Sequence, residues 1–259
     1  MSKQPIGIFD SGVGGLSIWR EIHLLLLNEH TIYLADSKNA PYGNRTKSEI
    51  IDLCIKNTDL LLEKGCKLIV VACNTATTNA IKTLRENYSI PFIGIEPAIK
   101  PAALNTKTKA VGILATKGTL TSELFHKTSD LYSSGIKVIE QVGEGLVELI
   151  ESGETNSDKI KTLLKNYLNP MIDAEIDYLV LGCTHYPFLM PILLELLPKH
   201  VKIIDSGAAV ARQTKAVLEK HNLLNLKKVT VETKFYSNGN PEVMSLILGE
   251  KYKVEKLDF

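Results

Sequence analysis

The sequence lacks long apolar runs and any excess of one charge. Its 259 residues hold 30 basic and 29 acidic side chains, for a formal charge of +1. Without a block of Lys or Arg there is no electrostatic case for binding nucleic acid. No apolar run approaches the roughly 20 residues of a membrane-spanning helix, and no signal peptide precedes the first strand pattern. These absences predict a cytoplasmic protein without membrane contact, whose partner is a small molecule.

Cysteines are few, and none forms a C-x-x-C pair or another pattern typical of metal ligands. In a reducing compartment we expect free thiols rather than disulfides. Cys54 falls on the apolar stripe of a helix expected over residues 46–64, and Cys66 follows the Gly65 expected to end it. Both are interpreted as structural thiols. Two cysteines, Cys73 and Cys183, remain as candidates for chemistry.

These two cysteines end segments of the same shape. LIVVACNT (residues 68–75) and YLVLGCTH (residues 178–185) are each a short apolar run that predicts a buried parallel strand and then polar residues that start a helix. Ligands of α/β folds bind beyond the carboxyl ends of such strands. If the two segments face each other, one site would contain two thiols, each a potential acid or base.

The similarity extends along the chain as an internal repeat. Paired segments are separated by nearly constant offsets of 105, 110 and 109 residues, measured from 6 to 111, from 73 to 183 and from 96 to 205. Segments 31–36 and 136–142 supply one more strand in each half. Four strands alternating with helices in each half predict an α/β fold of two pseudo-symmetric lobes, each a mainly parallel sheet flanked by helices, with the active site in the cleft between them. A chance likeness of two α/β units is the alternative.

The segment after the second repeat has no counterpart after the first. It predicts a helix over 208–221, a strand over 228–236, a turn at Asn238-Gly239 and a helix ending near Gly249. We expect this tail to cross back and complete the first lobe. Lobe one is then residues 1–97 plus 208–259, and lobe two is residues 98–207.

A glycine-rich turn follows the first strand. Asp10 and Ser11 lead into the glycines of residues 12–15, whose backbone N–H groups could hold an anion at a helix start. A dinucleotide fingerprint fits badly, because Ser17 stands where its third glycine would fall. Asp10 and Ser11 either cap the turn or serve the site. The helix that follows is expected to bury its four leucines, residues 24–27, in the core.

Each candidate cysteine is followed by polar residues that can support acid–base chemistry. Asn74-Thr75 open a helix after Cys73, and a helix N-terminus suits a carboxylate and lowers the pKa of a thiol. Thr184 and His185 follow Cys183, so an imidazole could exchange a proton with that sulfur.

Three other interpretations of these residues stay open. A zinc site made of Cys73, Cys183 and His185 lacks a fourth ligand. A hydrolase with Cys183 as nucleophile and His185 as base leaves Cys73 without a task. A two-lobed module that binds without catalysis is also compatible with the pattern. The loop over residues 35–46, with its Pro41-Tyr42-Gly43 sequence, is either a lid over the cleft or an ordinary strand-to-helix connection.

Five motifs, in the same order along the chain, closely resemble those of the glutamate racemases in the aspartate/glutamate racemase superfamily: DSGVGG at 10–15, PYG at 41–43, ACNTAT at 72–77, GILATKGT at 112–119 and GCTHYP at 182–187. The resemblance implies interconversion of L- and D-glutamate without a cofactor or metal, and a role in supplying D-glutamate for peptidoglycan. It also implies a homodimer. A related racemase acting on aspartate is the alternative.

The same resemblance implies roles for individual residues. Cys73 and Cys183 would be the two acid/base residues, with Cys183 acting on L-glutamate and Cys73 on D-glutamate, and Asp10 and His185 would assist them. The implied substrate contacts are Asp10, Ser11, Pro41, Tyr42, Gly43, Asn74, Thr75, Thr116, Thr119, Glu151, Thr184 and His185.

Overall fold

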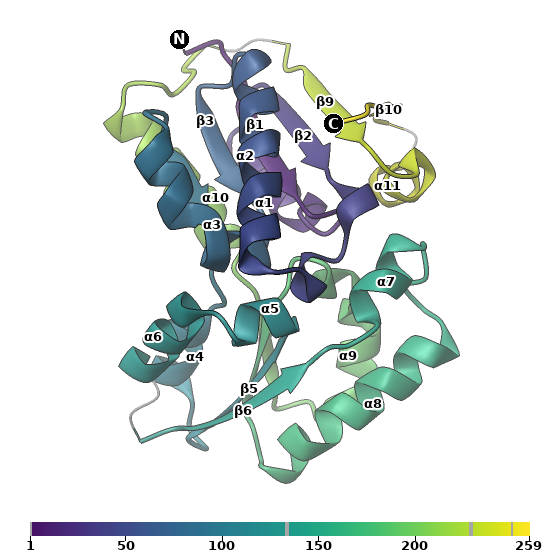
Figure 1. Cartoon of the computed structure of the whole chain (residues 1–259). Coiled ribbons are helices and arrows are strands. Elements are labelled where there is room, and N and C mark those ends of the chain that lie inside the picture. Colours follow the sequence, from purple (N-terminus) through teal and green to yellow (C-terminus); the bar gives the residue numbers. More distant parts are fainter. Residues whose placement is uncertain (1, 133–134, 228–229, 250) are drawn as a thin grey trace.

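The chain folds into two lobes, each built on one parallel sheet (Figure 1). The computed structural model describes residues 2–132, 135–227, 230–249 and 251–259. The first sheet has the strand order β10-β9-β2-β1-β3-β4, and the second has the order β6-β5-β7-β8. The strands of the first sheet are β1 (Ile6–Asp10), β2 (Thr31–Ala35), β3 (Leu68–Val71), β4 (Phe92–Gly94), β9 (Thr233–Ser237) and β10 (Val254–Lys256); those of the second are β5 (Ala110–Ala115), β6 (Lys137–Val142), β7 (Tyr178–Gly182) and β8 (Lys202–Ile204).

The repeat seen in the sequence is present in the order of the strands. The run β2-β1-β3-β4 in one sheet corresponds to β6-β5-β7-β8 in the other, and every pairing within both sheets is parallel. The central strands β1 and β3 are buried along their whole length, as expected of apolar strands covered by helices on both faces. The predicted α/β fold class is therefore confirmed.

Helices cover both sheets and follow the strands in turn. The first lobe carries α1 (Leu16–Leu25), α2 (Lys47–Glu63), α3 (Asn74–Asn87), α10 (Gly207–Lys220) and α11 (Pro241–Leu248). The second carries α4 (Ile99–Asn105), α5 (Lys117–Leu120), α6 (Glu123–Tyr132), α7 (Leu146–Glu151), α8 (Asp158–Asp173) and α9 (Met190–Leu196). Short 3-10 turns lie at Ser37–Asn39, Tyr42–Asn44 and Tyr186–Leu189. Among the described residues, no helix has the length and apolar character that crossing a bilayer requires.

The ends of α2 agree with their sequence signals. Thr46 accepts a hydrogen bond from the backbone N–H of Glu49, whose carboxylate accepts one from the N–H of Thr46, so the helix begins with a capping box. Gly65 has a φ of +78° directly after the helix, as a C′ glycine does. Cys54 and Cys66 are buried in the apolar packing of the first lobe, as expected of structural thiols.

The expectation for the four leucines after the first turn was wrong. Helix α1 ends at Leu25, and it buries the face formed by Leu16, Ile18, Trp19 and Ile22. Leu24 and Leu27 are 68% and 66% exposed, and of the four leucines only Leu26 is buried. The apolar run extends beyond the buried stripe of the helix, so its residues take directions that the core does not cover.

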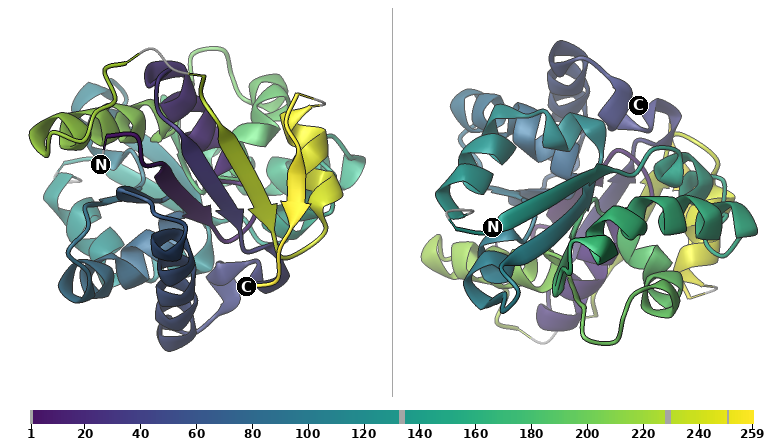
Figure 2. Two further views of the ribbon diagram at one scale, coloured as in Figure 1. Left: turned by 90° about the horizontal axis from the view of Figure 1, so that it is seen from above. Right: turned by 90° about the horizontal axis from the view of Figure 1, so that it is seen from below.

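The C-terminal tail returns to the first lobe. Helix α10 packs against α1, and strand β9 pairs with β2 from Thr31 opposite Thr233 onward. Figure 2 shows β9 and β10 extending the first sheet at its edge in the view from above. Strand β9 begins at Thr233 rather than at 228, and residues 228–229 lie outside the described residues. The residue limits proposed for the two lobes stay predictions.

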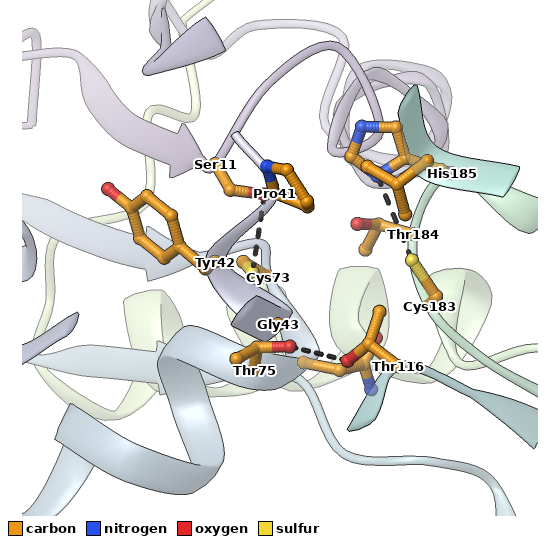
Figure 3. Close-up of a pocket in the computed structure, with 12 residues that line it drawn as sticks. Ser11, Pro41, Tyr42, Gly43, Cys73, Thr75, Thr116, Cys183, Thr184 and His185 are labelled. Atoms are coloured by element: carbon orange, nitrogen blue, oxygen red, sulfur yellow. Dashed lines mark hydrogen bonds between the residues drawn. The ribbon is translucent and has the colours of Figure 1, made fainter. Parts of the chain in front are cut away.

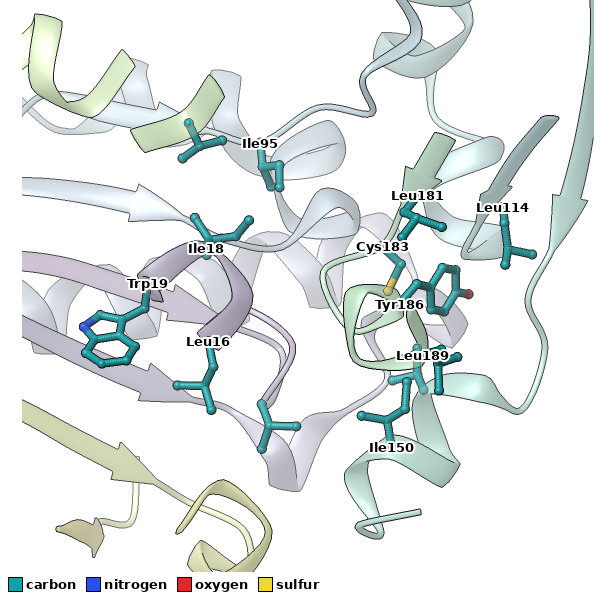
Figure 4. Close-up of a cluster of buried hydrophobic side chains, with 14 of the residues drawn as sticks. Leu16, Ile18, Trp19, Ile95, Leu114, Ile150, Leu181, Cys183, Tyr186 and Leu189 are labelled. Carbon is teal, nitrogen blue, oxygen red and sulfur yellow. The ribbon is translucent and has the colours of Figure 1, made fainter. Parts of the chain in front are cut away.

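One apolar cluster joins the lobes (Figure 4). It runs from Ile18 and Ile95 on the first lobe to Leu181 and Tyr186 on the second, and the sulfur of Cys183 lies within it. The lobes are thus packed against each other next to the residues predicted to carry the chemistry.

Candidate active site

The carboxyl ends of the inner strands of both sheets meet around one small cavity (Figure 3). Ser11 follows β1 and Cys73 follows β3, while Thr116 follows β5 and Cys183 follows β7. This is the edge at which parallel α/β sheets bind ligands. The cavity is lined by Ser11, Pro41, Tyr42, Gly43, Cys73, Asn74, Thr75, Thr116, Val147, Cys183, Thr184 and His185.

Most residues predicted for the site line this cavity, and both predicted cysteines do. Asp10, Thr119 and Glu151 do not line it; they lie behind lining residues and form hydrogen bonds to them. Val147 was missed by the sequence reasoning. It is a buried apolar residue of α7, and nothing in its surrounding sequence distinguishes it from a core residue.

Cys73 forms the N-cap of α3. Its sulfur accepts a hydrogen bond from the N–H of Ala76 at 3.4 Å and lies 3.7 Å from the hydroxyl of Ser11. The bond from Ala76 lowers the pKa of the thiol, as expected at a helix start. Burial and the nearby Asp10 carboxylate outweigh it and raise the pKa. The expected net lowering of the thiol pKa was wrong, because the side chain is only 5% exposed.

Cys183 lies next to a histidine that is held by a carboxylate. The Nδ1 of His185 is 3.8 Å from the sulfur, and its Nε2 is 2.6 Å from the Oε1 of Glu151. Burial lowers the pKa of His185, but the hydrogen bonds to Cys183 and Glu151 prevail and raise it well above its usual value. Burial raises the pKa of Glu151, and the contact with His185 prevails and lowers it. The Nδ1 of His185 therefore faces the sulfur of Cys183, while its Nε2 is held by the Glu151 carboxylate.

Asp10 joins the two lobes. Its carboxylate accepts hydrogen bonds from the N–H of Gly12 at 2.7 Å and, across the cleft, from the hydroxyl of Thr184 at 2.8 Å. Burial raises its pKa to about 6, although His185 and these bonds act in the opposite direction. This group remains close to its titration range at neutral pH.

The glycine-rich turn of the first lobe contacts the His185–Glu151 pair directly. The N–H of Val13 donates to Glu151 at 2.6 Å. A Cβ added at Gly14 would lie 2.2 Å from the Nδ1 of His185, and one at Gly12 would lie 1.9 Å from the Glu151 carboxylate. Glycine is required here for close approach, not for anchoring a dinucleotide.

Polar groups on the other side of the cavity are suited to a carboxylate. The hydroxyls of Thr75, Thr116 and Thr119 lie within 2.7–3.2 Å of one another. Both polar atoms of the Asn74 side chain are buried without a partner among the described residues. Such groups are costly unless a ligand satisfies them. Within the described residues, no group of three or more His, Cys, Asp or Glu is arranged to hold a metal ion.

Comparison with known proteins agrees with this geometry. The model of the Asp/Glu/hydantoin racemase family matches residues 15–214. The chain belongs to this family. It is 47% identical to the glutamate racemase of Herpetosiphon aurantiacus, with 93% of this chain and 95% of that protein covered.

Solved structures of racemases have the same fold. Glutamate racemase isoform RacE1 from Bacillus anthracis superimposes with a TM-score of 0.89 at 30% identity, covering 100% of this chain and 98% of that one. The Escherichia coli glutamate racemase, in complex with L-glutamate and the activator UDP-MurNAc-ala, gives 0.87 at 35% identity, covering 98% of each chain. The residues matched to the racemase family include Cys73 and Cys183, whereas Asp10 and Ser11 precede them.

Proposed function

We propose that the chain is a glutamate racemase that interconverts L- and D-glutamate by proton transfer between two cysteines, without a cofactor. The observation that carries the proposal is that Cys73 and Cys183, from different lobes, line the same cavity. A racemase needs a proton acceptor on one face of the α-carbon and a proton donor on the other. Glutamate as substrate is supported by the relatives that carry this name over nearly the full chain.

The reaction is a two-base transfer. One thiolate removes the α-proton, so a C–H bond breaks and an S–H bond forms, and the second thiol delivers its proton to the opposite face. The roles exchange in the reverse direction. His185 lies next to Cys183, where its ring can exchange a proton with the sulfur, and the family resemblance assigns this cysteine to L-glutamate. Cys73 then starts as the thiol, in keeping with its raised pKa.

Negative charge that develops at the α-carbon must be stabilised next to a carboxylate. Preorganised donors in a site without bulk water do this best. The hydroxyls of Thr75 and Thr116, the amide of Asn74 and the N-terminus of α3 are the donors we assign to the substrate, and Thr119 holds these two hydroxyls from behind the cavity wall. Ser11, Thr184 and the backbone of residues 41–43 complete the lining.

Two assisting residues act from behind the cavity wall. We assign Asp10 to the orientation of Thr184 and Glu151 to the charge state of His185, because those are their hydrogen-bond partners. Glu151 is thus proposed as a positioning residue instead of a substrate contact.

The experiment that tests the function follows the α-proton. The protein is incubated with L-glutamate in D₂O, the incorporation of deuterium is measured by NMR and the enantiomers are separated by chiral chromatography. We expect deuterium incorporation together with formation of D-glutamate. If a parallel incubation converts aspartate but not glutamate, the substrate is aspartate. Binding of glutamate without exchange of its α-proton would refute catalysis.

The biological setting and the assembly are part of the same proposal. D-glutamate would be supplied for peptidoglycan by a cytoplasmic homodimer. Sedimentation velocity of the purified protein measures the assembly, and a monomer at micromolar concentration would contradict the dimer.

A further inference from the structure

A buried carboxylate that no step of the proposed reaction uses begins the loop between β2 and α2. Asp36 is 1% exposed. Its Oδ2 accepts a hydrogen bond from the hydroxyl of Tyr42 at 2.5 Å, and its Oδ1 accepts one from the Asn39 amide at 2.7 Å and another from the Asn238 amide. Burying a carboxylate costs free energy unless it accepts such hydrogen bonds. Asp36 therefore holds Tyr42, Asn39 and Asn238 together.

The side chain of Tyr42 points away from the substrate cavity. Figure 3 shows its hydroxyl on the far side from the two sulfurs, although residues 41–43 line the cavity. Asn57 of α2 donates to the same hydroxyl at 3.2 Å. Burial, together with the nearby Asp36, raises the pKa of Tyr42, so the hydroxyl keeps the proton that it donates. The Tyr42 side chain is therefore an anchor set into the first lobe.

The third partner brings in the C-terminal strand. The side chain of Asn238, directly after β9, also donates to the backbone carbonyl of Phe259 at 3.2 Å and accepts from the N–H of Lys38 at 2.9 Å. Its own N–H donates to the carbonyl of Ala35 at 3.2 Å. Asn238 thus contacts Ala35 before Asp36, Lys38 after it, and Phe259 near the C-terminal strand.

The same loop also reaches the second lobe. The hydroxyl of Ser37 donates to Glu151 at 2.7 Å, and Glu151 holds His185. Ser37, the residue after Asp36, thus connects this loop to the residues that support Cys183.

We propose that Asp36 is a positioning residue of the reaction: through Tyr42 it anchors the loop of residues 37–44 against the substrate cavity, and through Asn238 it couples that anchor to the C-terminal strand. The kinetic tests of this inference rest on the proposed function, since racemisation is the activity that they measure. It also assigns a task to Asn238, which lies outside residues 15–214, the part of the chain matched by the family model.

The first variant is Asp36→Asn. The amide keeps one acceptor oxygen but replaces the other with an NH₂ group, which cannot accept a hydrogen bond from Tyr42, Asn39 or Asn238. At least one bond that Asp36 accepts is therefore lost. We expect KM for glutamate to rise about tenfold while kcat falls less than about threefold, because the cysteines and His185 are untouched. Asp177→Asn is the matched control. That carboxylate accepts bonds from Thr106, Lys107 and Thr108 in the second lobe, so its loss should lower Tm without raising KM.

A double-mutant cycle tests whether Asp36 acts through Tyr42. Tyr42→Phe removes only the hydroxyl, and we expect the Asp36→Asn/Tyr42→Phe protein to be no worse in KM than Asp36→Asn alone. Asn238→Ala should raise KM in the same direction, by about threefold or more. Fully additive effects of Asp36 and Tyr42, or a fall of kcat alone, would overturn the proposal.

Hydrogen exchange separates this inference from the proposed function. Without substrate, the backbone amides of residues 37–44 should exchange at least about tenfold faster in Asp36→Asn than in the wild type and in Asp177→Asn. Unchanged exchange in an active enzyme overturns the anchor and leaves the racemase intact. If the wild type has no racemase activity but the loop still exchanges faster in Asp36→Asn, the proposed function is refuted and the anchoring role of Asp36 stands.

Discussion

The two candidate cysteines differ from the other two in their surroundings more than in their burial. All four are buried, but only Cys73 and Cys183 border the cavity. Replacement of either by Ala should lower kcat for racemisation at least about 100-fold, because an acid/base group contributes a factor of about 10²–10⁴. Steady-state kinetics in both directions checks this. Cys66→Ala is the control, and it should stay within about threefold of the wild type. Full activity of Cys73→Ala would refute the two-base mechanism.

The contact between Glu151 and His185 predicts a pH dependence. The contact raises the pKa of His185, so the imidazolium beside Cys183 persists as pH rises and is lost only above that raised pKa. Glu151→Gln removes the negative charge beside His185 and so lowers the pKa of that imidazole. The fall of activity at alkaline pH should therefore move down by at least about one pH unit.

The profile of kcat/KM against pH is the measurement for this variant. Glu148→Gln, on the exposed side of the same helix, is its matched control and should leave the profile unchanged. An unshifted profile in Glu151→Gln would mean that the alkaline fall of activity does not come from deprotonation of His185.

At this scale the sequence predicted most of the residues that line the cavity but not how they are paired. Cys73, Cys183 and His185 follow apolar strands, and the strand pattern indicated their common edge. Glu151 is 138 residues from its partner Val13, and its neighbouring sequence contains no signal of that contact. Asp36 and Val147 were missed for the same reason, because the direction of a side chain depends on packing from distant segments.

At the scale of elements, the turn between β1 and α1 is fitted to the second lobe. Gly14→Ala would place a Cβ 2.2 Å from the Nδ1 of His185, and this ring is fixed by its bond to Glu151. Either the turn or the ring must shift. We therefore expect kcat/KM to fall at least about tenfold, with a lower Tm.

A second glycine provides the control for that variant. Gly65→Ala places its Cβ in open space at a φ of +78°, so it should cost about 1 kcal/mol of stability and leave the kinetics unchanged. Thermal unfolding and steady-state kinetics of both variants make the comparison. Equal activity of Gly14→Ala and the wild type would contradict the close fit of the turn.

Elements with a strong local pattern were predictable, and those without one were not. The eight strands of the repeat and helix α2 follow from apolar runs, spacing and caps. Strand β10 has three residues and, unlike the short strands β4 and β8, no counterpart in the repeat, so its sequence carries too little pattern. The leucines of residues 24–27 were misjudged because apolar composition does not reveal which part of a run the core covers.

At the scale of the whole molecule, the lobes are closed over a cavity too small for an amino acid. Its volume is about 10 Å³, room for about one water molecule. Hydrogen bonds across the cleft hold the lobes together: the Thr184 hydroxyl donates to Asp10, the Ser17 hydroxyl donates to the carbonyl of Thr184, and the N–H of Val13 donates to Glu151. Substrate entry therefore requires the lobes or the 37–44 loop to move apart.

This opening predicts the order in which the thiols react. Cys73 and Cys183 become more accessible when the cleft opens, whereas Cys54 and Cys66 do not border the cavity and gain no exposure from that opening. Labelling with iodoacetamide, followed by mass spectrometry of peptides, should modify the first pair at least about tenfold faster than the second. Saturating D-glutamate should slow the first pair and leave the second unchanged, because a ligand stabilises only the state that binds it. Labelling of all four cysteines at the rate of global unfolding would show that the lobes do not separate in the native state.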